Sequence, residues 1–337
     1  MVIKKNLSII VFFVIQNFAL AQSQRNEASV AVAMNAMRKM QGLQKSPISN
    51  WGGEPFASWA HFCNLRDNAS DKQLLKLLKD TNAVVKGYSF MVLCGRKNIN
   101  IYKILLKHLS DNQIISWADT DVGKIEKIGD FFIHEAIKSN RISEIEKKKI
   151  QQIFLRNRAI NLQYRNIIFK EIETNNKNYV KIKKFVTSEN NQNALVALSK
   201  YQKQVDKIFI EKSLSEIKNE NYGFECIINF PDSTFIPYLK AFHQRQMNIN
   251  KGLGFHKFRL AYKAVASYKN QFSVDYFQNV LQNSTEEAFP QHCGYIWIAT
   301  QRFPSKIFVE INKQGLILKL WERNKRFPFI KDFASLR

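Results

Sequence analysis

The sequence has few of the residues that interrupt helices. Its 337 residues include only 12 glycines and 7 prolines, the two residue types least favourable inside a helix. Hydrophobic residues make up 45% and charged residues 23% of the chain, which excludes collagen-like and disordered proteins. Four cysteines in a chain of this length also exclude a small disulfide scaffold. Helical spacing fills most of the sequence and sustained strand alternation is nearly absent, so we expect an all-α fold.

Long apolar runs are also scarce, and the clearest one lies at the N-terminus. Lys4 and Lys5 precede an apolar stretch over residues 7–20, and Ala19-Leu20-Ala21 supplies the small residues that signal peptidase requires. We therefore expect a signal peptide over residues 1–21 and an exported protein, either periplasmic or secreted. The run is shorter than the roughly 20 residues of a membrane helix, so no transmembrane span is expected. An uncleaved anchor is the alternative.

The clearest helical pattern lies in residues 70–111. Ser70 and Gln73 form a capping box, which predicts the start of a helix. Asn82 is placed to cap a second helix, and Gly95 is placed to end it. A third helix is expected from apolar residues that share one face: Ile101, Ile104, Leu105 and Leu109. Short helices joined by tight turns bury their apolar faces only against neighbouring helices.

The second of these helices resembles a known repeat. Asp80 in the turn, followed by Val84, Val85, Tyr88 and Phe90, is similar to the HEAT-type helical repeat. These are packing residues, so the resemblance implies a fold and not an activity. The implied fold is an α-solenoid of HEAT-like helical hairpins, either continuous or kinked into two segments. HEAT-like proteins are mostly scaffolds and adaptors, so the resemblance also implies a binding role.

Two pairs of similar segments favour a repeat. Residues 88–90 (Tyr-Ser-Phe) recur as residues 222–224 (Tyr-Gly-Phe), and residues 197–201 resemble residues 264–268. The tyrosines that end the second pair, Tyr201 and Tyr268, are 67 residues apart. This distance fits two repeats of about 33 residues. Chance similarity between amphipathic helices is the alternative.

Polar stretches set the expected organisation. After the signal peptide we expect a lead-in segment (22–69), a HEAT-like helical segment (70–190) and a second helical repeat segment (191–337). Breaks are expected at residues 187–192 and 248–254, as kinks in one array or as linkers. A capping box at Ser143 and Glu146 opens a further helix, and residues 160–172 continue the helical phase. Residues 307–320 fit a hairpin or a helix, and we favour the helix.

Acidic residues are few relative to basic ones, and the formal charge is +23. Loss of a signal peptide containing Lys4 and Lys5 would leave +21. The 37 lysines outnumber the 14 arginines, which argues against specific nucleic-acid recognition, because base readout typically uses the arginine fork. We expect another protein or an anionic envelope polymer as the partner. The sequence does not indicate the oligomeric state.

The densest basic regions are residues 156–184 and 240–263, and the second contains no acidic residue. Its cations are interleaved with rings: Phe242, His243, Phe255, His256, Phe258 and Tyr262. Exposed rings would stack on a polyanion. Rings at helical spacing would instead belong to the core, with the lysines and arginines forming a solvated face.

No catalytic, cofactor-binding or metal-binding residues are predicted. His61 and Cys63 lack the further ligands that zinc requires, as do His292 and Cys293. Residues 119–121 (Asp-Thr-Asp) lack the glycine and terminal glutamate of a calcium loop. Nucleophile elbows, P-loops and dinucleotide-binding glycine motifs are absent from the sequence. We therefore expect a non-catalytic binding or scaffold module, the alternative being an envelope-associated hydrolase that uses Cys63 or His292.

The sequence does not show whether the four cysteines are free thiols or form disulfides. Cys94 and Cys226 fall at apolar helix positions, where free buried thiols are common. Cys63 and Cys293 are candidates for a disulfide in an oxidising compartment. Four cysteines allow three pairings, and the sequence does not choose between them.

Overall fold

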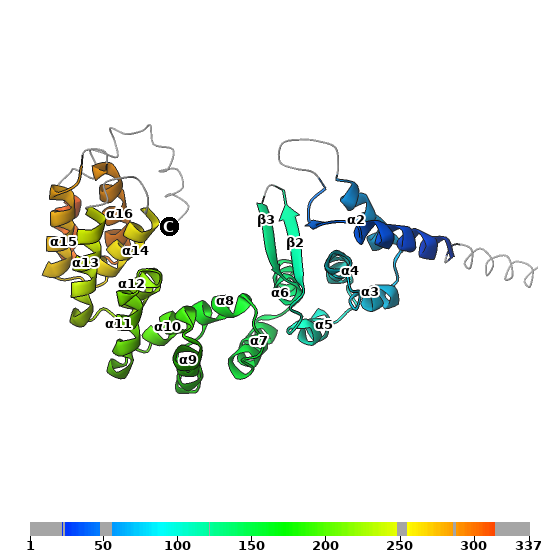
Figure 1. The fold of residues 1–337 in the computed structure, drawn as a ribbon, viewed down its shortest axis with the longest axis horizontal. Coiled ribbons are helices and arrows are strands. Elements are labelled where there is room, and N and C mark those ends of the chain that lie inside the picture. The colour runs from blue at the N-terminus through cyan, green and yellow to red at the C-terminus, as the bar shows by residue number, and fades with distance from the viewer. Residues whose placement is uncertain are drawn as a thin grey trace, which may run out of the picture. The chain divides into compact units, whose positions relative to one another are not determined.

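The computed structural model describes residues 22, 24–47, 56–120, 122–247, 255–285 and 288–313. The chain divides into two compact units, Met1–Ile168 and Phe169–Arg337. The described residues are mostly helical, as expected, with one small three-stranded sheet that was not expected (Figure 1). None of the described helices is both long and apolar enough to cross a membrane. The predicted signal peptide, residues 1–21, lies outside the described residues.

In the first unit, residues 24–37 are helical and the sheet lies between helices. Its elements are β1 (Leu43–Gln44), α2 (Ala57–Asn68), α3 (Asp71–Leu77), α4 (Ala83–Gly95), α5 (Ile101–His108), β2 (Ile114–Asp119), β3 (Val122–Lys127), α6 (Ile128–Lys138) and α7 (Glu144–Arg156). Helix α8 (Tyr164–Glu171) crosses the division between the units. Of the helical phase expected over residues 160–172, residues 164–171 are helical as α8, whereas residues 160–163 form a loop before it.

The predicted helix ends of this unit are confirmed. The Ser70 hydroxyl accepts a hydrogen bond from the backbone N–H of Gln73, and the Gln73 side chain accepts one from the backbone N–H of Ser70. The Asn82 side chain accepts from the first turn of α4, and α4 ends at Gly95. The capping box of Ser143 likewise opens α7. These caps are local, which is why the sequence predicts them.

Helix α4 lies at the centre of the core of the first unit. Its Tyr88 and Phe90 are fully buried, and the ring of Phe90 stacks on that of Phe132 from α6 with 3.9 Å between centroids. A Cβ atom at Gly87 would lie 2.7 Å from Leu43 Cδ1 and 2.8 Å from Ile115 Cδ1. Glycine at position 87 therefore lets α4 approach β1 and β2 closely.

The sheet contains a hairpin that the sequence analysis did not predict. Strand β2 pairs antiparallel with β3 and parallel with β1. The turn between β2 and β3 includes Thr120, which has a left-handed backbone (φ 54°). Asp119 at this turn forms an ion pair with Lys138, 3.0 Å away. Residues 119 and 120 therefore belong to a hairpin turn, while Asp121 lies outside the described residues.

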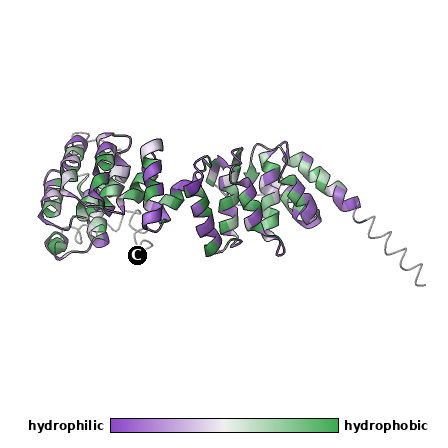
Figure 2. Cartoon of the chain, turned by 90° about the horizontal axis from the view of Figure 1, so that it is seen from below, coloured by the Kyte–Doolittle hydropathy of each residue, from purple (hydrophilic) through white to green (hydrophobic). Residues whose placement is uncertain are grey.

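The second unit consists of helices with short 3-10 turns. Its elements are α9 (Asn176–Glu189), α10 (Gln192–Ser199), η1 (Gln204–Asp206), α11 (Lys207–Ser215), α12 (Glu220–Asn229), η2 (Ser233–Phe235), α13 (Ile236–Met247), α14 (Phe255–Ala266), α15 (Gln271–Gln282), α16 (Phe289–Arg302), η3 (Lys306–Phe308) and α17 (Val309–Lys313). Helix α10 packs against α12, α12 against α14, and α14 against α16. Helix α9 packs on α10, α11 on α12, and α15 on both α14 and α16. The helices have green and purple sides, as expected for amphipathic helices (Figure 2).

The similar segments 197–201 and 264–268 have the same local structure. Each segment ends a helix in a turn that contains its tyrosine: residues 200 and 201 follow α10, and residues 267 and 268 follow α14. The Tyr201 hydroxyl donates to the carbonyl of Asn175 at 3.0 Å, and the Tyr268 hydroxyl donates to that of Asp232 at 2.6 Å. The residues after both tyrosines are left-handed, with φ of 51° and 52°. Each tyrosine thus ties the end of one helix to a turn of the chain before it.

The remaining expectations concern the two breaks in the helical array, the C-terminal stretch over residues 307–320 and the segment boundaries. The break expected at residues 187–192 is the turn between α9 and α10, where Asn190 is left-handed. The break expected at residues 248–254 lies outside the described residues. Residues 306–313 are helical, in agreement with the helix favoured there, and residues 314–320 are not described. The segment boundaries at 69/70 and 190/191 stay predictions.

Candidate binding site

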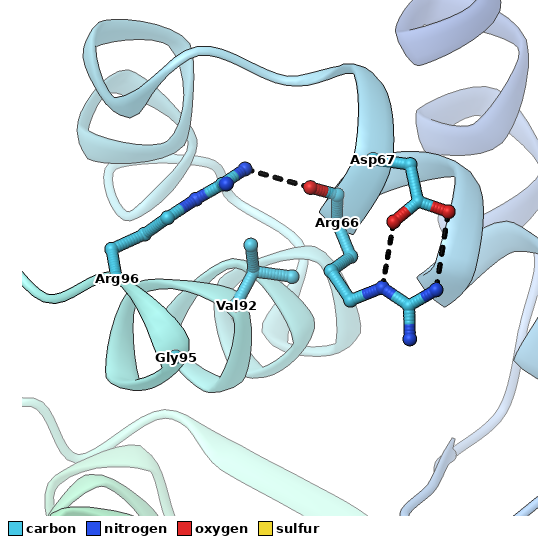
Figure 3. Close-up of a pocket in the computed structure, with 5 residues that line it drawn as sticks. All are labelled: Arg66, Asp67, Val92, Gly95 and Arg96. Carbon is cyan, nitrogen blue, oxygen red and sulfur yellow. Dashed lines mark hydrogen bonds and ion pairs between the residues drawn. The ribbon is translucent and has the colours of Figure 1, made fainter.

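A shallow pocket lies in the first unit between the ends of α2 and α4. It has a volume of about 450 Å³ and is lined by Arg66, Asp67, Val92, Gly95 and Arg96 (Figure 3). Because α2 and α4 both end here, the pocket contains backbone carbonyls that have no partner within their own helices. Charged side chains supply hydrogen-bond donors to these carbonyls.

The charged groups of the pocket bind one another or the backbone. Arg66 binds Asp67 through two hydrogen bonds, of 2.7 and 3.1 Å, and both side chains are about half exposed. The hydrogen bond from Arg66 lowers the pKa of Asp67. Arg96 donates to the carbonyls of Arg66 (2.7 Å) and Ala69 (3.1 Å). Arg96 therefore caps the end of α2, and the pocket offers little free charge to a ligand.

A second candidate lies in the second unit, where α14 packs against α16. It consists of Arg259 and Lys263, one turn apart on α14, and Arg302, the last residue of α16. We call these three residues the α14–α16 basic cluster. Burial, together with the nearby charges of Arg259 and Arg302, lowers the pKa of Lys263. Arg259 and Arg302 are therefore each close enough to Lys263 for their charges to act on it.

The α14–α16 basic cluster has no counter-charge among the described residues. None of its members forms an ion pair or a hydrogen bond there, whereas most buried charges in proteins are paired. The Arg259 Nε atom is buried and has no hydrogen-bond partner. Arg302 is exposed, and Arg259 and Lys263 are partly buried. The cluster thus combines uncompensated positive charge with access from solvent.

The aromatic residues of the basic segment 240–263 belong to the core where they are described. Phe242 and Tyr262 are fully buried, and Phe258 packs against both of them and against His292. The side chains of residues 255 and 256 lie outside the described part of the structure. Stacking on a polyanion through Phe242 or Tyr262 is therefore wrong, because neither ring reaches the surface.

His292 and Cys293 are buried inside the second unit. His292 Nδ1 lies 2.7 Å from the Tyr262 hydroxyl. Burial lowers the pKa of His292 to about 4 and raises the pKa of the Cys293 thiol to about 12. At neutral pH the imidazole is uncharged and the thiol is protonated. Neither group is reachable by an external substrate, since their exposed fractions are 5% and 2%.

All four cysteines are free thiols. Cys94 and Cys226 are buried, as expected, and burial raises the pKa of both. Cys63 is partly buried in the first unit and Cys293 is buried in the second, and they form no disulfide with each other. Within the described residues, no group of three or more His, Cys, Asp or Glu side chains is placed to hold a metal ion.

The structure also contains a buried polar network that the sequence analysis did not find. The Glu126 carboxylate on β3 accepts hydrogen bonds from Trp117 (2.6 Å) and Lys124 (2.6 Å), and His134 Nδ1 lies 3.0 Å from it. Burial would raise the pKa of Glu126, but the hydrogen bonds from His134, Lys124 and Trp117 outweigh burial and lower it. With its side chain fully buried, this carboxylate holds the hairpin against α6. Its partners come from three elements, so no local motif marks it.

A comparison with known proteins gave no match among protein-family models, curated proteins or solved structures. The resemblance to HEAT-type repeats therefore stays a prediction from residues 70–111.

Proposed function

We propose that the protein is an exported helical-repeat module that binds another macromolecule and has no catalytic activity of its own. The observation that supports this most is the packing of the second unit, in which α10, α12, α14 and α16 contact one another in sequence order. Neighbour-to-neighbour packing of helical hairpins is typical of α-solenoids, whose extended surfaces bind partners. The HEAT-like pattern around Tyr88 favours the same architecture in the first unit.

The chemistry of the described side chains supports binding over catalysis. His292, one of the two residues that the hydrolase alternative would use beside Cys63, is buried and hydrogen-bonded to Tyr262. The described pocket lies at the ends of α2 and α4, where Arg96 caps the end of α2 and Arg141 binds the carbonyls of Cys94 and Arg96 at the end of α4. A general base or nucleophile must reach its substrate, and His292 does not.

The charge of the chain favours a negatively charged partner, either a protein or an anionic envelope polymer. The formal charge is +23, and the α14–α16 basic cluster is a place where described cations lack carboxylate partners. Long-range attraction would steer an anionic partner toward such a surface. A partner held by charge alone would dissociate at high salt, and one held by shape and apolar contact would not.

The test is capture of a partner from a native envelope extract by the tagged chain beginning at Gln22, washed at low and at high salt. The control bait is the variant R259Q/K263Q/R302Q, which lowers the charge without removing apolar core residues. We expect a defined partner that the unmodified chain retains at low salt and that the triple variant retains more weakly. Hydrolysis of an envelope polymer that disappears with His292→Ala would contradict the proposal and favour the hydrolase.

A further inference from the structure

We propose that the free edge of strand β3 pairs with the same strand of a second copy of the chain, which gives a symmetric dimer. Strand β3 is hydrogen-bonded to β2 on one side, and no strand among the described residues pairs with its other side (Figure 1). An edge strand carries unpaired backbone N–H and C=O groups, which are a template for pairing with another chain. The dimer goes beyond the proposed binding function and does not depend on it.

A backbone hydrogen bond shows which residues of β3 face the free edge. The N–H group of Ile128, directly after the strand, donates to the carbonyl of Gln113 at 2.8 Å, so residue 128 points its backbone groups at the β2 side. This direction alternates along an antiparallel strand. Residues 122, 124 and 126 therefore also face β2, and Gly123, Ile125 and Lys127 turn their N–H groups to the free edge.

The other side of the sheet agrees with this assignment. Ala118 of β2 lies opposite Gly123, and its carbonyl accepts from the backbone N–H of Lys45 on the β1 side at 2.8 Å. Ala118 therefore points away from β3. Residues opposite each other in an antiparallel pair either both point inward or both point outward, so Gly123 points away from β2.

Charge selects one register for a symmetric antiparallel pair of β3 strands. An axis at Lys124 would place two lysines directly opposite each other, and an axis at Glu126 would place two carboxylates opposite each other, which is destabilising in both cases. An axis at Ile125 places Lys124 opposite Glu126 of the second copy, and Ile125 opposite Ile125. Axes at Gly123 or Lys127 leave most of the strand unpaired, because the hairpin turn and α6 begin there.

The side chains of β3 fit this register. Ile125 is 68% exposed, and its outward N–H and C=O groups would exchange hydrogen bonds with those of Ile125 in the copy. Lysines commonly protect edge strands from pairing, but both lysines of β3 are held within the unit. Lys124 Nζ lies 2.6 Å from the Glu126 carboxylate, and Lys127 Nζ donates to the carbonyl of Asn161. Pairing would remove the apolar Ile125 side chain from water, which is favourable.

Long-range charge opposes the dimer and gives it a characteristic salt dependence. The formal charge of the chain is +23, so two copies repel each other at a distance. Salt screens this repulsion and leaves the strand pairing intact, so the dimer should strengthen as salt rises. An anionic partner would show the opposite dependence. One pair of strands buries less than a standard interface, and we expect a dissociation constant on the order of 0.1 mM.

The test is sedimentation equilibrium of the purified chain beginning at Gln22, in reducing buffer, over about 10 µM to 1 mM protein, a range that brackets this constant. We expect a monomer–dimer equilibrium that shifts toward the dimer at high salt. Ile125→Lys places two cations opposite each other and should raise the dissociation constant more than about tenfold. Ile145→Lys adds the same charge at a 69% exposed isoleucine of α7 and should change it less than about twofold.

Charge complementation distinguishes this pairing from a loss of folding. Ile125→Glu alone should be monomeric, like Ile125→Lys, because two carboxylates would face each other. An equimolar mixture of the two variants should dimerise, since each introduced lysine then lies opposite an introduced glutamate. This mixed dimer should weaken as salt rises, in contrast to the wild type. A mixture that stays monomeric would overturn the proposal, because Ile125 would then not lie at the axis.

Three other outcomes would overturn the second copy as the occupant of this edge. The first is a wild-type chain that stays monomeric over the whole concentration range. The second is an equal effect of Ile125→Lys and Ile145→Lys, since association would then follow general surface charge. The third is a monomeric wild type that captures an envelope protein which Ile125→Lys does not capture, because the edge would then pair with a strand of that protein.

Discussion

At the scale of single residues, Tyr88 joins the helical core to the sheet. Its ring is fully buried, and its hydroxyl accepts from the backbone N–H of Gln44 at 2.9 Å and donates to the carbonyl of Gln44 at 3.2 Å. Tyr88→Ala should lower the free energy of unfolding by about 3 to 5 kcal/mol, as for other large aromatic truncations. Tyr88→Phe removes only the hydrogen bonds and should cost about 1 kcal/mol. Urea denaturation measures both, and equal stability of the two variants would show that the ring is not packed.

His292 gives a residue-scale prediction on pH. Because the folded pKa of about 4 lies below the usual 6.5, the unfolded chain binds a proton between these values and the folded chain does not. Stability should therefore fall as pH decreases from about 6.5 to 4, by on the order of 3 kcal/mol for this group. In His292→Gln that part of the pH dependence should vanish. Denaturation curves at pH 7 and pH 4.5 measure it, and parallel profiles for the wild type and the variant would contradict the assignment.

At the scale of elements, two glycines of α4 form a matched pair. A Cβ at Gly87 would lie under 3.0 Å from side chains of β1 and β2, whereas a Cβ at Gly95 meets nothing within 4 Å. Gly87→Ala should therefore lower the free energy of unfolding by about 1 to 3 kcal/mol, as for other overpacked cores. Gly95→Ala should be close to neutral. Thermal unfolding compares the two, and equal melting temperatures would place α4 farther from the sheet.

The elements also show what the sequence could predict. Ser70, Asn82 and Ser143 cap their helices through residues two or three positions away, so their signals are local. The hairpin was missed because β3 inverts the usual pattern: its buried residue is Glu126, whereas Val122 and Ile125 are exposed. The basic segment 240–263 contains two members of the α14–α16 basic cluster. The packing of α14 against α16 brings the charge of Arg302 to bear on Lys263, and sequence spacing does not record that packing.

At the scale of the whole molecule, the positive charge of the chain bears on the proposed export. A protein that leaves the cytosol meets anionic envelope surfaces, where a strongly positive chain is attracted at long range. Salt would weaken that attraction and leave the core packing of each unit intact. The proposed export would therefore determine which partners are accessible, and it depends on the signal peptide predicted over residues 1–21.

We expect the chain purified from an expressing cell to begin at Gln22, because Ala19 and Ala21 occupy the positions that signal peptidase reads. Intact-mass spectrometry and N-terminal sequencing of the envelope and soluble fractions measure this. Ala21→Arg should block cleavage and leave residues 1–21 attached, with the protein held at the membrane by its apolar stretch. Ser29→Ala, outside the cleavage region, serves as the control and should be processed like the wild type. Recovery of the uncleaved wild-type chain at the membrane would instead establish the anchor, and its recovery in the cytosol would contradict export.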